Sequence, residues 1–390
     1  MTNWQVPLSD LDLSQAEIEA VTKVLHSRWL SMGPVTAQFE QCFADYVGVK
    51  YACAVANCTA ALHLAHLALG AAPGDTVICP SLTFVATANA IRYTGATPVF
   101  ADVISSDDLN IAPASIESHI DATTKGICIV HYGGYPCDME GILDLARQYK
   151  LYVVEDVAHA PGAACWVTDP DSGVQVLKSC GSIGDIGCFS FFSNKNMTTG
   201  EGGMVTTNDP AIAEKLRILR SHGMTSLTWD RQQGHSFSYD VVALGYNYRI
   251  DEMRAAIGMV QLGKLTENNQ KRGELTNFYR EKLSDVEAIS MPFQTHEATA
   301  SYHLFPVLLK KAVLRSNFME FMKTKGIQTS IHYPPIHQFT NYRSLYPSNN
   351  LSVTSDVGER IVTLPLFADL KREQIDYIAT AIKKWALEIS

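Results

Sequence analysis

Residues 124–156 read TKGICIVHYGGYPCDMEGILDLARQYKLYVVED. The apolar run 124–130 predicts a strand, 139–149 predicts an amphipathic helix, and 151–155 predicts a second strand. Two neighbouring strands joined through a helix run parallel, because a parallel pair needs a long crossover. The stretch therefore predicts an α/β fold, a mainly parallel sheet covered by helices.

The same alternation extends in both directions along the chain. Further strands are predicted at 51–55, 76–78 and 98–101, and helices at 36–47, 59–69, 84–93 and 211–219. Residues 14–27 predict a helix capped by Ser14, with an apolar stripe of Ile18, Val21, Val24 and Leu25. Residues 165–182 predict a surface hairpin or loop, and the polar segment 225–240 an irregular excursion.

A long helix from 252 toward 283 is expected to lead into a second, smaller part of the molecule. That part has a predicted strand at 304–309 and helices at 316–325 and 372–387. We therefore expect a large domain over residues 1–255 and a smaller C-terminal α/β domain over 256–390.

Composition excludes several classes of function. The 390 residues are 46% apolar and 18% charged, an ordinary globular composition. A formal net charge of −9 argues against nucleic acid or an anionic membrane as the main partner. The chain has no apolar run of about 18 residues and its first residues lack a secretory signal pattern, so we expect a cytoplasmic protein.

The nine cysteines lie between Cys42 and Cys188, mostly within apolar segments, and none forms a CxxC pair. This pattern predicts buried free thiols in a reducing compartment and disfavours a metal site.

Residues 187–203 read GCFSFFSNKNMTTGEGG and carry the main chemical signal. Lys195 is the only charged residue between the apolar strand and the Gly-rich turn 200–203. A lysine removed from water shifts toward the neutral amine, which attacks carbonyls and forms Schiff bases. This predicts a pyridoxal 5′-phosphate (PLP) enzyme.

Ligands of parallel sheets bind at the carboxyl ends of the strands, so residues that follow strands are the candidates for the rest of the site. Asp156 can pair with the pyridine nitrogen, although it can equally cap the next helix. His159 lies three residues further on, near the ring or in a purely structural role. Phe84 can stack on the ring or belong to the core.

A phosphate would lie at the start of the helix after the first strand, where backbone N–H groups and the helix dipole favour an anion. Cys58 and Thr59 occupy this position, and Ser190 follows a neighbouring strand. Taken alone, Thr59 is more simply a helix cap.

Several motifs in order resemble the DegT/DnrJ/EryC1/StrS family of PLP-dependent sugar aminotransferases over nearly the whole chain. They include WLSMGP at 29–34, TFVATANAI at 83–91, EDVAHA at 155–160, FSFF at 189–192 with Lys195, GEGG at 200–203, GYNYR at 245–249 and IHYPPIH at 331–337. The resemblance implies the PLP-dependent transferase fold type I, like that of aspartate aminotransferase, and a homodimer with shared active sites.

By the same resemblance, Lys195 binds PLP covalently and then acts as the general base, while Asp156 pairs with the pyridine nitrogen. Phe84 and His159 line the ring, and Cys58, Thr59 and Ser190 hold the phosphate. Asn247 reaches the phosphate of the other subunit, and segment 225–240 lies near the neighbour's substrate. Candidate substrate contacts are Trp29, Met32, His332, Tyr333 and His337.

The implied reaction moves an amino group to a keto-sugar, typically a nucleotide-linked 3- or 4-keto sugar. The amino donor most often used in the family is L-glutamate. The products of such reactions serve amino-sugar, surface polysaccharide including lipopolysaccharide, or natural-product biosynthesis. Unactivated keto-sugars and keto-cyclitols are alternative acceptors, and a non-catalytic PLP-binding regulator is an alternative of another class. A sugar dehydratase is disfavoured, because that branch has histidine where this chain has Lys195.

The chain departs from the family at two places. Asn57-Cys58-Thr59 stands where the family has Ser-Gly-Thr, so the side chain of Cys58 narrows the phosphate site. The stretch 165–180 is longer than the family norm, and either oligomer contacts or substrate access would explain it.

Overall fold

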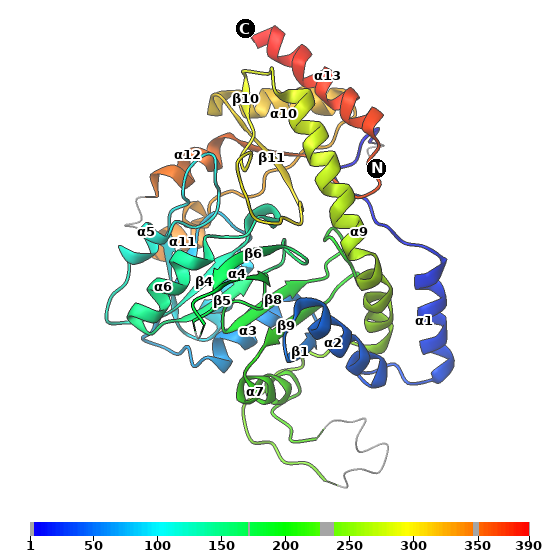
Figure 1. The fold of residues 1–390 in the computed structure, drawn as a ribbon, viewed down its shortest axis with the longest axis vertical. Helices are drawn as coiled ribbons and strands as arrows, with labels where there is room; N and C mark the ends of the chain where they lie inside the picture. Colours follow the sequence, from blue (N-terminus) through cyan, green and yellow to red (C-terminus); the bar gives the residue numbers. More distant parts are fainter. Residues whose placement is uncertain (1–3, 171, 227–237, 346–350, 390) are drawn as a thin grey trace.

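The computed structural model describes residues 4–170, 172–226, 238–345 and 351–389. A seven-stranded sheet lies at its centre (Figure 1). Its strands, in spatial order, are β1 (Tyr51–Val55), β9 (Gly203–Thr207), β8 (Ile186–Ser190), β5 (Tyr152–Asp156), β4 (Thr124–Val130), β2 (Thr76–Pro80) and β3 (Thr97–Ala101). Only β9 runs against the others, so the sheet is mixed, and the parallel core predicted from residues 124–156 is confirmed.

Helices cover both faces of this sheet. The helices of this part are α1 (Gln15–Ser27), α2 (Pro34–Val47), α3 (Cys58–Ala68), α4 (Ala86–Tyr93), α5 (Pro113–Glu117), α6 (Met139–Tyr149) and α7 (Pro210–Arg220), with a 3-10 turn at Tyr132–Gly134. Successive strand side chains point to opposite faces. Val77 and Val154 therefore pack under α3 and α4, whereas Ile78 and Val153 pack under α6.

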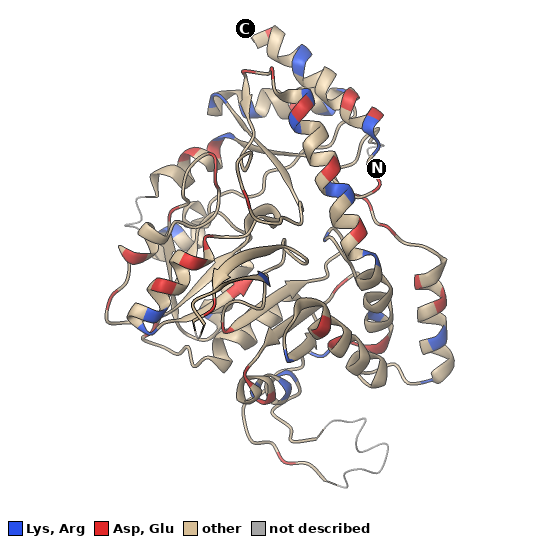
Figure 2. Cartoon of the chain, in the orientation of Figure 1, with Lys and Arg blue, Asp and Glu red and all other residues tan. Residues whose placement is uncertain are grey.

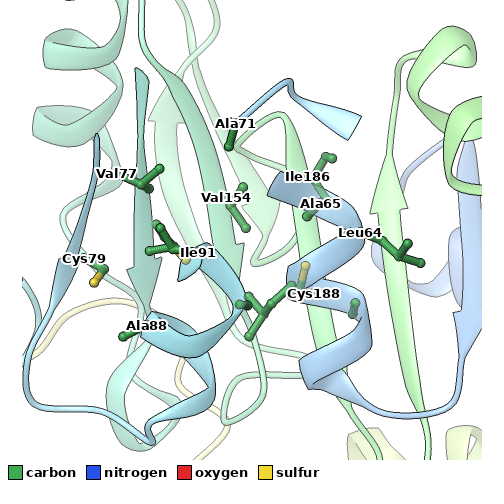
Figure 3. Close-up of a cluster of buried hydrophobic side chains, with 14 of the residues drawn as sticks. Leu64, Ala65, Ala71, Val77, Cys79, Ala88, Ile91, Val154, Ile186 and Cys188 are labelled. Atoms are coloured by element: carbon green, nitrogen blue, oxygen red, sulfur yellow. The ribbon is translucent and has the colours of Figure 1, made fainter. Parts of the chain in front are cut away.

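Figure 3 shows the first of these layers, in which Ala65 of α3 lies beside Ile186 and Cys188 of β8. Small side chains such as Ala65 let the helix approach the sheet closely. Eight of the nine cysteines are buried and all nine are free, as the sequence predicted.

The C-terminal part is built on α9 (Glu252–Leu283), which runs from the large sheet to the opposite end of the molecule (Figure 1). Its other elements are β10 (Ile289–Ser290), β11 (Phe305–Leu309), β12 (Ile361–Leu364), α10 (Arg315–Thr324), α11 (Thr340–Leu345), α12 (Ser352–Arg360) and α13 (Arg372–Ile389), with 3-10 turns at Ala312–Leu314 and Ile336–Gln338. Val6 packs into the same apolar cluster as α13. The domain boundary at residues 255 and 256 stays a prediction.

Some local predictions need correction. Ser14 caps α1 as expected, but Ile18 and Leu25 are 61% and 52% exposed, and the buried residues of α1 are Glu17 and Val24. The helix packs on α9 through a polar contact, in which Gln261 and Lys264 reach the carboxylate of Glu17. An apolar stripe alone could not reveal this, because the partner helix is far away in sequence.

The hairpin predicted at 165–182 is present as β6 (Ala164–Thr168) paired with β7 (Gln175–Ser179). In segment 225–240, Thr225 and Asp240 are joined by a backbone hydrogen bond, and residues 227–237 lie outside the described residues.

No helix in the described ranges is both long and apolar enough to cross a bilayer. Figure 2 shows acidic and basic residues interspersed over the outer helices.

Glu155 and Asp156, neighbours at the end of β5, have different roles because they point to opposite faces. The Glu155 carboxylate accepts hydrogen bonds from three backbone N–H groups in residues 181–184, at 2.7–2.8 Å, and from His131 Nε2 at 3.0 Å. His131 Nδ1 accepts from the backbone N–H of Cys137, so its Nε2 carries the proton and donates.

These bonds also bear on metal binding. His131, Glu155 and Cys180 have potential ligand atoms within 4.8 Å of one another. The hydrogen bonds occupy the Glu155 oxygens and both His131 nitrogens, so we interpret this group as the joint between the β6–β7 hairpin and the sheet.

We predict that Glu155→Gln lowers the free energy of unfolding by about 3 kcal/mol, because the amide must turn an N–H₂ toward donors. Urea unfolding followed by circular dichroism measures this. Glu214→Gln, on the exposed side of α7, is the control and should change stability by less than about 0.5 kcal/mol. Equal stability of the two variants would contradict this account of Glu155.

Candidate active site

A cavity of about 430 Å³ opens at the carboxyl ends of the strands, and we call it the Lys195 cavity. It is lined by Asn57, Cys58, Thr59, Leu62, Thr83, Phe84, Ala86, Val130, Asp156, Ala158, His159, Ser190, Phe192, Asn194, Lys195, Glu201, His332 and Tyr333. Seven of the eight residues predicted to bind the cofactor are in this set. These seven come from four separate stretches of chain, which the parallel topology gathers at one edge.

Lys195 follows β8 and lines this cavity with its partly buried side chain. Burial lowers the pKa of its amine to about 8, although the negative charge of Asp156 acts in the opposite direction. A substantial fraction of such an amine is neutral near physiological pH. It can therefore attack an aldehyde without first losing a proton to another base.

Asp156 is the last residue of β5 and lies on the α3 and α4 side of the sheet. Its Oδ1 accepts from the Ala158 backbone N–H at 3.1 Å, and its Oδ2 accepts from Thr87 Oγ1 at 2.9 Å. Burial raises the pKa of this carboxyl group. Among the described residues, Lys195 acts on this carboxylate electrostatically but no cation lies within ion-pair distance of it, and a protonated pyridine nitrogen would supply one.

His159 holds a defined tautomer. Its Nδ1 accepts from the Gly133 backbone N–H at 3.2 Å, so the proton lies on Nε2, which donates to Tyr333 Oη at 2.9 Å. Burial holds the pKa of His159 well below its usual range, which keeps the ring neutral. The His159 and Tyr333 rings stack at 5.8 Å between centroids, and Phe84, 57% exposed, approaches Tyr333.

The N-terminus of α3 forms one end of the cavity. Its N-cap is Asn57, whose Oδ1 accepts from the Ala60 backbone N–H at 2.9 Å, so the simpler interpretation of Thr59 as the cap is wrong. Thr59 lies in the first turn and is free to face an anion together with Ser190. Cys58 also lines the cavity, and burial keeps its thiol protonated by raising its pKa well above the usual value.

Gly203 makes room for this end of the cavity. It pairs with Val55 of β1 and with Ser190 of β8, directly beside Asn57. A Cβ at this position would lie 2.7 Å from the backbone carbon of Asn57 and 2.8 Å from its oxygen. Gly200, in the preceding turn, has φ of +79°, a left-handed conformation that favours glycine.

The structure does not bring every predicted residue to the Lys195 cavity. Asn247 is exposed and pairs with Ser221 outside it. Trp29 lines a separate cavity of about 610 Å³ between α1, α2 and α9, and Met32 is buried. His332 and Tyr333 line the Lys195 cavity, whereas His337 bonds Ser81 Oγ at 2.8 Å behind it.

Sequence reasoning missed Thr87, whose hydroxyl donates a hydrogen bond to the Asp156 carboxylate. The signal was present, because Thr83 and Thr87 are four residues apart and their hydroxyls lie 3.2 Å from each other in the structure. It also missed Asn194 and Glu201, which line the cavity on either side of Lys195 in sequence.

The donor set fits PLP. A partly neutral amine can hold the aldehyde, a carboxylate short of a cation can face the ring nitrogen, and a helix N-terminus opened by Gly203 can hold the phosphate. Asp156, Ser190 and Thr59 belong to different strands or helices, so only the folded chain presents them together.

Comparisons with known proteins agree with this chemistry. The sequence model of the DegT/DnrJ/EryC1/StrS aminotransferase family matches residues 11–383. The spore coat polysaccharide biosynthesis protein SpsC of Bacillus subtilis is 38% identical over 388 residues, which cover 98% of this chain and 97% of SpsC.

Two solved structures are similar over nearly the whole chain. Helicobacter pylori PseC, an aminotransferase involved in the biosynthesis of pseudoaminic acid, has a TM-score of 0.89 at 30% identity, covering 99% of this chain and 100% of PseC. The PLP form of the "putative sugar aminotransferase Spr1654" of Streptococcus pneumoniae has a TM-score of 0.88 at 27% identity, covering 99% of each chain.

The fold and the cavity therefore define a PLP-dependent aminotransferase of fold type I. The chain belongs to the DegT/DnrJ/EryC1/StrS aminotransferase family. The family, the fold and the cofactor predicted from the sequence are confirmed. The roles of the individual site residues stay predictions.

We predict that Lys195 in the cofactor-free protein reacts with pyridoxal along a titration curve centred near pH 8. Burial lowers the amine pKa, so the reactive neutral form grows as the pH rises through 8 and is complete well below 10.5, the ordinary lysine value. Stopped-flow absorbance measures the rate, and Lys195→Ala identifies the signal. A midpoint near 10.5, or an unchanged signal in that variant, would contradict the assignment.

We predict that Gly203→Ala weakens PLP binding at least about tenfold, because the added Cβ meets the backbone of Asn57 and closes the phosphate end. Equilibrium dialysis measures the affinity. Gly263→Ala is the matched control, since its Cβ meets nothing within 4 Å on the exposed side of α9. Unchanged PLP affinity in Gly203→Ala would show that the phosphate lies elsewhere.

Proposed function

We propose that this aminotransferase takes an amino group from an amino acid, L-glutamate, and transfers it to a keto-sugar, a nucleotide-linked 3- or 4-keto sugar. The observation that carries the proposal is the buried amine of Lys195 in one cavity with Asp156 and the N-terminus of α3. The similarity to SpsC and PseC, whose descriptions concern polysaccharide and pseudoaminic acid biosynthesis, supports a sugar as the acceptor.

We assign Lys195 as the residue that binds the cofactor, Asp156 as the partner of its ring nitrogen, and Thr59, Ser190 and the backbone at Cys58 as the phosphate ligands. Bound PLP supplies an aldehyde for covalent attachment and an electron sink that stabilises a carbanion at the donor's α-carbon. Thr87 holds the Asp156 carboxylate toward the cavity at 2.9 Å. Phe84 and His159 enclose the ring position.

Lys195 has two tasks in this scheme. It holds the cofactor at rest, and its freed Nζ then removes the proton from the α-carbon of the donor. A pKa of about 8 suits both tasks, because the amine is available as a base near neutral pH and still returns the proton readily. A water molecule supplies the oxygen with which glutamate leaves as 2-oxoglutarate, and its nitrogen is retained in the site. That nitrogen then replaces the keto oxygen of the sugar, which is released as water, and the sugar leaves as an amino sugar.

The remaining predicted contacts concern the acceptor and the second subunit. His332 and Tyr333 are assigned to the acceptor, because they line the cavity and offer polar groups to a polyhydroxylated ligand. Asn247 is exposed on its own chain, which suits a contact with the cavity of a partner in a homodimer. Trp29, Met32 and His337 stay predicted substrate contacts.

The test described below distinguishes two other functions from the proposed one. An unactivated keto-sugar or keto-cyclitol would use the same cavity without the nucleotide. A non-catalytic PLP-binding regulator would keep Lys195 and Asp156 without turnover.

The test uses the PLP-loaded protein, ¹⁵N-labelled L-glutamate and a panel of dTDP-, UDP- and GDP-linked 3- and 4-keto sugars beside unactivated keto-sugars and keto-cyclitols. We expect 2-oxoglutarate and a ¹⁵N-labelled nucleotide amino sugar, detected by mass spectrometry, and neither product with Lys195→Ala.

Each other outcome has a defined meaning. Conversion of the cofactor by glutamate with amination of unactivated acceptors only would support the first alternative. No conversion by any amino acid would support the regulator and overturn the proposal.

A further inference from the structure

Asn196, the residue after Lys195, is held by a buried hydrogen-bond network. Its Nδ2 donates to Asn269 Oδ1 of α9 and to the backbone oxygen of Ser301, both at 2.7 Å. Its Oδ1 contacts His303 Nδ1 at 2.9 Å. Asn269 Nδ2 donates in turn to the Pro161 backbone oxygen at 2.8 Å. The network joins α9, the β5–β6 connection and the start of β11 to the residue beside Lys195.

The donor and the acceptor of every hydrogen bond in this network follow from the backbone groups at the two ends of the network. Backbone oxygens of Pro161 and Ser301 can only accept, so both asparagine Nδ2 groups point at them. The Oδ1 of Asn196 therefore faces His303, and His303 Nδ1 must carry the proton. His303 is thus a donor whose orientation is fixed by Asn196.

His303 also lies close to the cavity. It is 5% exposed, and its ring lies 4.5 Å from the ring of His159, which lines the cavity. Burial, followed by the positive charge of Lys195, holds the pKa of His303 well below its usual range, so the ring stays neutral. A neutral imidazole can pack beside the Lys195 amine without adding a like charge.

Lys195 needs such support. The described residues offer its Nζ no hydrogen bond, and its backbone N–H donates to the Phe192 oxygen at 3.0 Å. The position of the amine is therefore set by its backbone and by the side chains around it. On the C-terminal side of Lys195, Asn196 is the first residue anchored by side-chain bonds.

We propose that His303 is a positioning residue for Lys195, which acts by holding the amide of Asn196. This inference rests on the proposed role of Lys195 as the cofactor-binding amine. The groups that surround the amine are the carboxyl of Asp156, the thiol of Cys58 and the imidazoles of His159, His303 and His332. Loss of the His303 bond leaves two of the three bonds on the Asn196 amide, so the chain beside Lys195 can shift and the amine becomes more fully hydrated.

The test compares three histidine variants of the full-length enzyme. His303→Leu removes the donor, and His303→Asn keeps an N–H₂ group near the position of Nδ1. His66→Leu is the matched control, because His66 is likewise a buried histidine and loses one bond, between its Nδ1 and Tyr152 Oη at 3.1 Å, in the layer under α3. PLP is removed from each enzyme, and the rate of its recapture is followed by absorbance from pH 6 to pH 11.

We expect His303→Leu to raise the pH midpoint of recapture by about one unit, since a hydrated amine has a higher pKa. At pH 7 this slows recapture about tenfold, because the neutral fraction of the amine falls by that factor. The glutamate half-reaction should slow similarly at unchanged glutamate KM. His303→Asn and His66→Leu should both keep the wild-type midpoint.

An unchanged midpoint in His303→Leu, or an equal shift in His66→Leu, would overturn the proposal. If His303→Leu does not fold, Asn269→Ala removes the other end of the network and must shift the midpoint in the same direction. Failure of the proposed function has a separate signature, which is wild-type recapture by Lys195→Ala.

Discussion

The site depends on the free-energy cost of burying the charged amine of Lys195. Burial shifts the pKa of Lys195 to about 8, whereas the carboxylate of Asp156 acts to restore the charge. The balance leaves an amine that is partly neutral and a carboxyl group whose own pKa is raised by burial. Burial penalises the charged form of both groups. A ligand with an aldehyde and a basic ring nitrogen would offset this penalty, because the aldehyde can react with the amine and the protonated nitrogen can pair with the carboxylate.

The sheet determines where these two groups meet. Strands β1, β8, β5, β4 and β2 run in the same direction, so the residues that follow them collect at one edge. The alternation of side chains along β5 sends Asp156 to this cavity and Glu155 to the opposite face. There Glu155 anchors the β6–β7 hairpin through backbone N–H groups. One strand end thereby serves both the chemistry and the fold.

Rigidity around the amine comes from elements far away in sequence. Asn269 belongs to α9, and Ser301 and His303 precede β11, yet all three form hydrogen bonds with the side chain of Asn196. The C-terminal part of the chain thus takes part in the site at the sheet edge. This arrangement gives a physical reason for the length of α9, which spans both parts of the molecule.

The sequence by itself determined the elements and the kind of chemistry, because periodicity and strand-end residues are local signals. The strand at 124–130 and the helix at 139–149 were predicted with their observed bounds, and Lys195, Asp156, Ser190 and Thr59, predicted to bind the cofactor, line one cavity. Only the tertiary structure decided the antiparallel direction of β9, the polar contact of Glu17 with α9, and the hydrogen bonds of Thr87 to Asp156 and of His303 to Asn196. Each of these depends on which residue, distant in sequence, lies opposite, and spacing along the chain does not specify that partner.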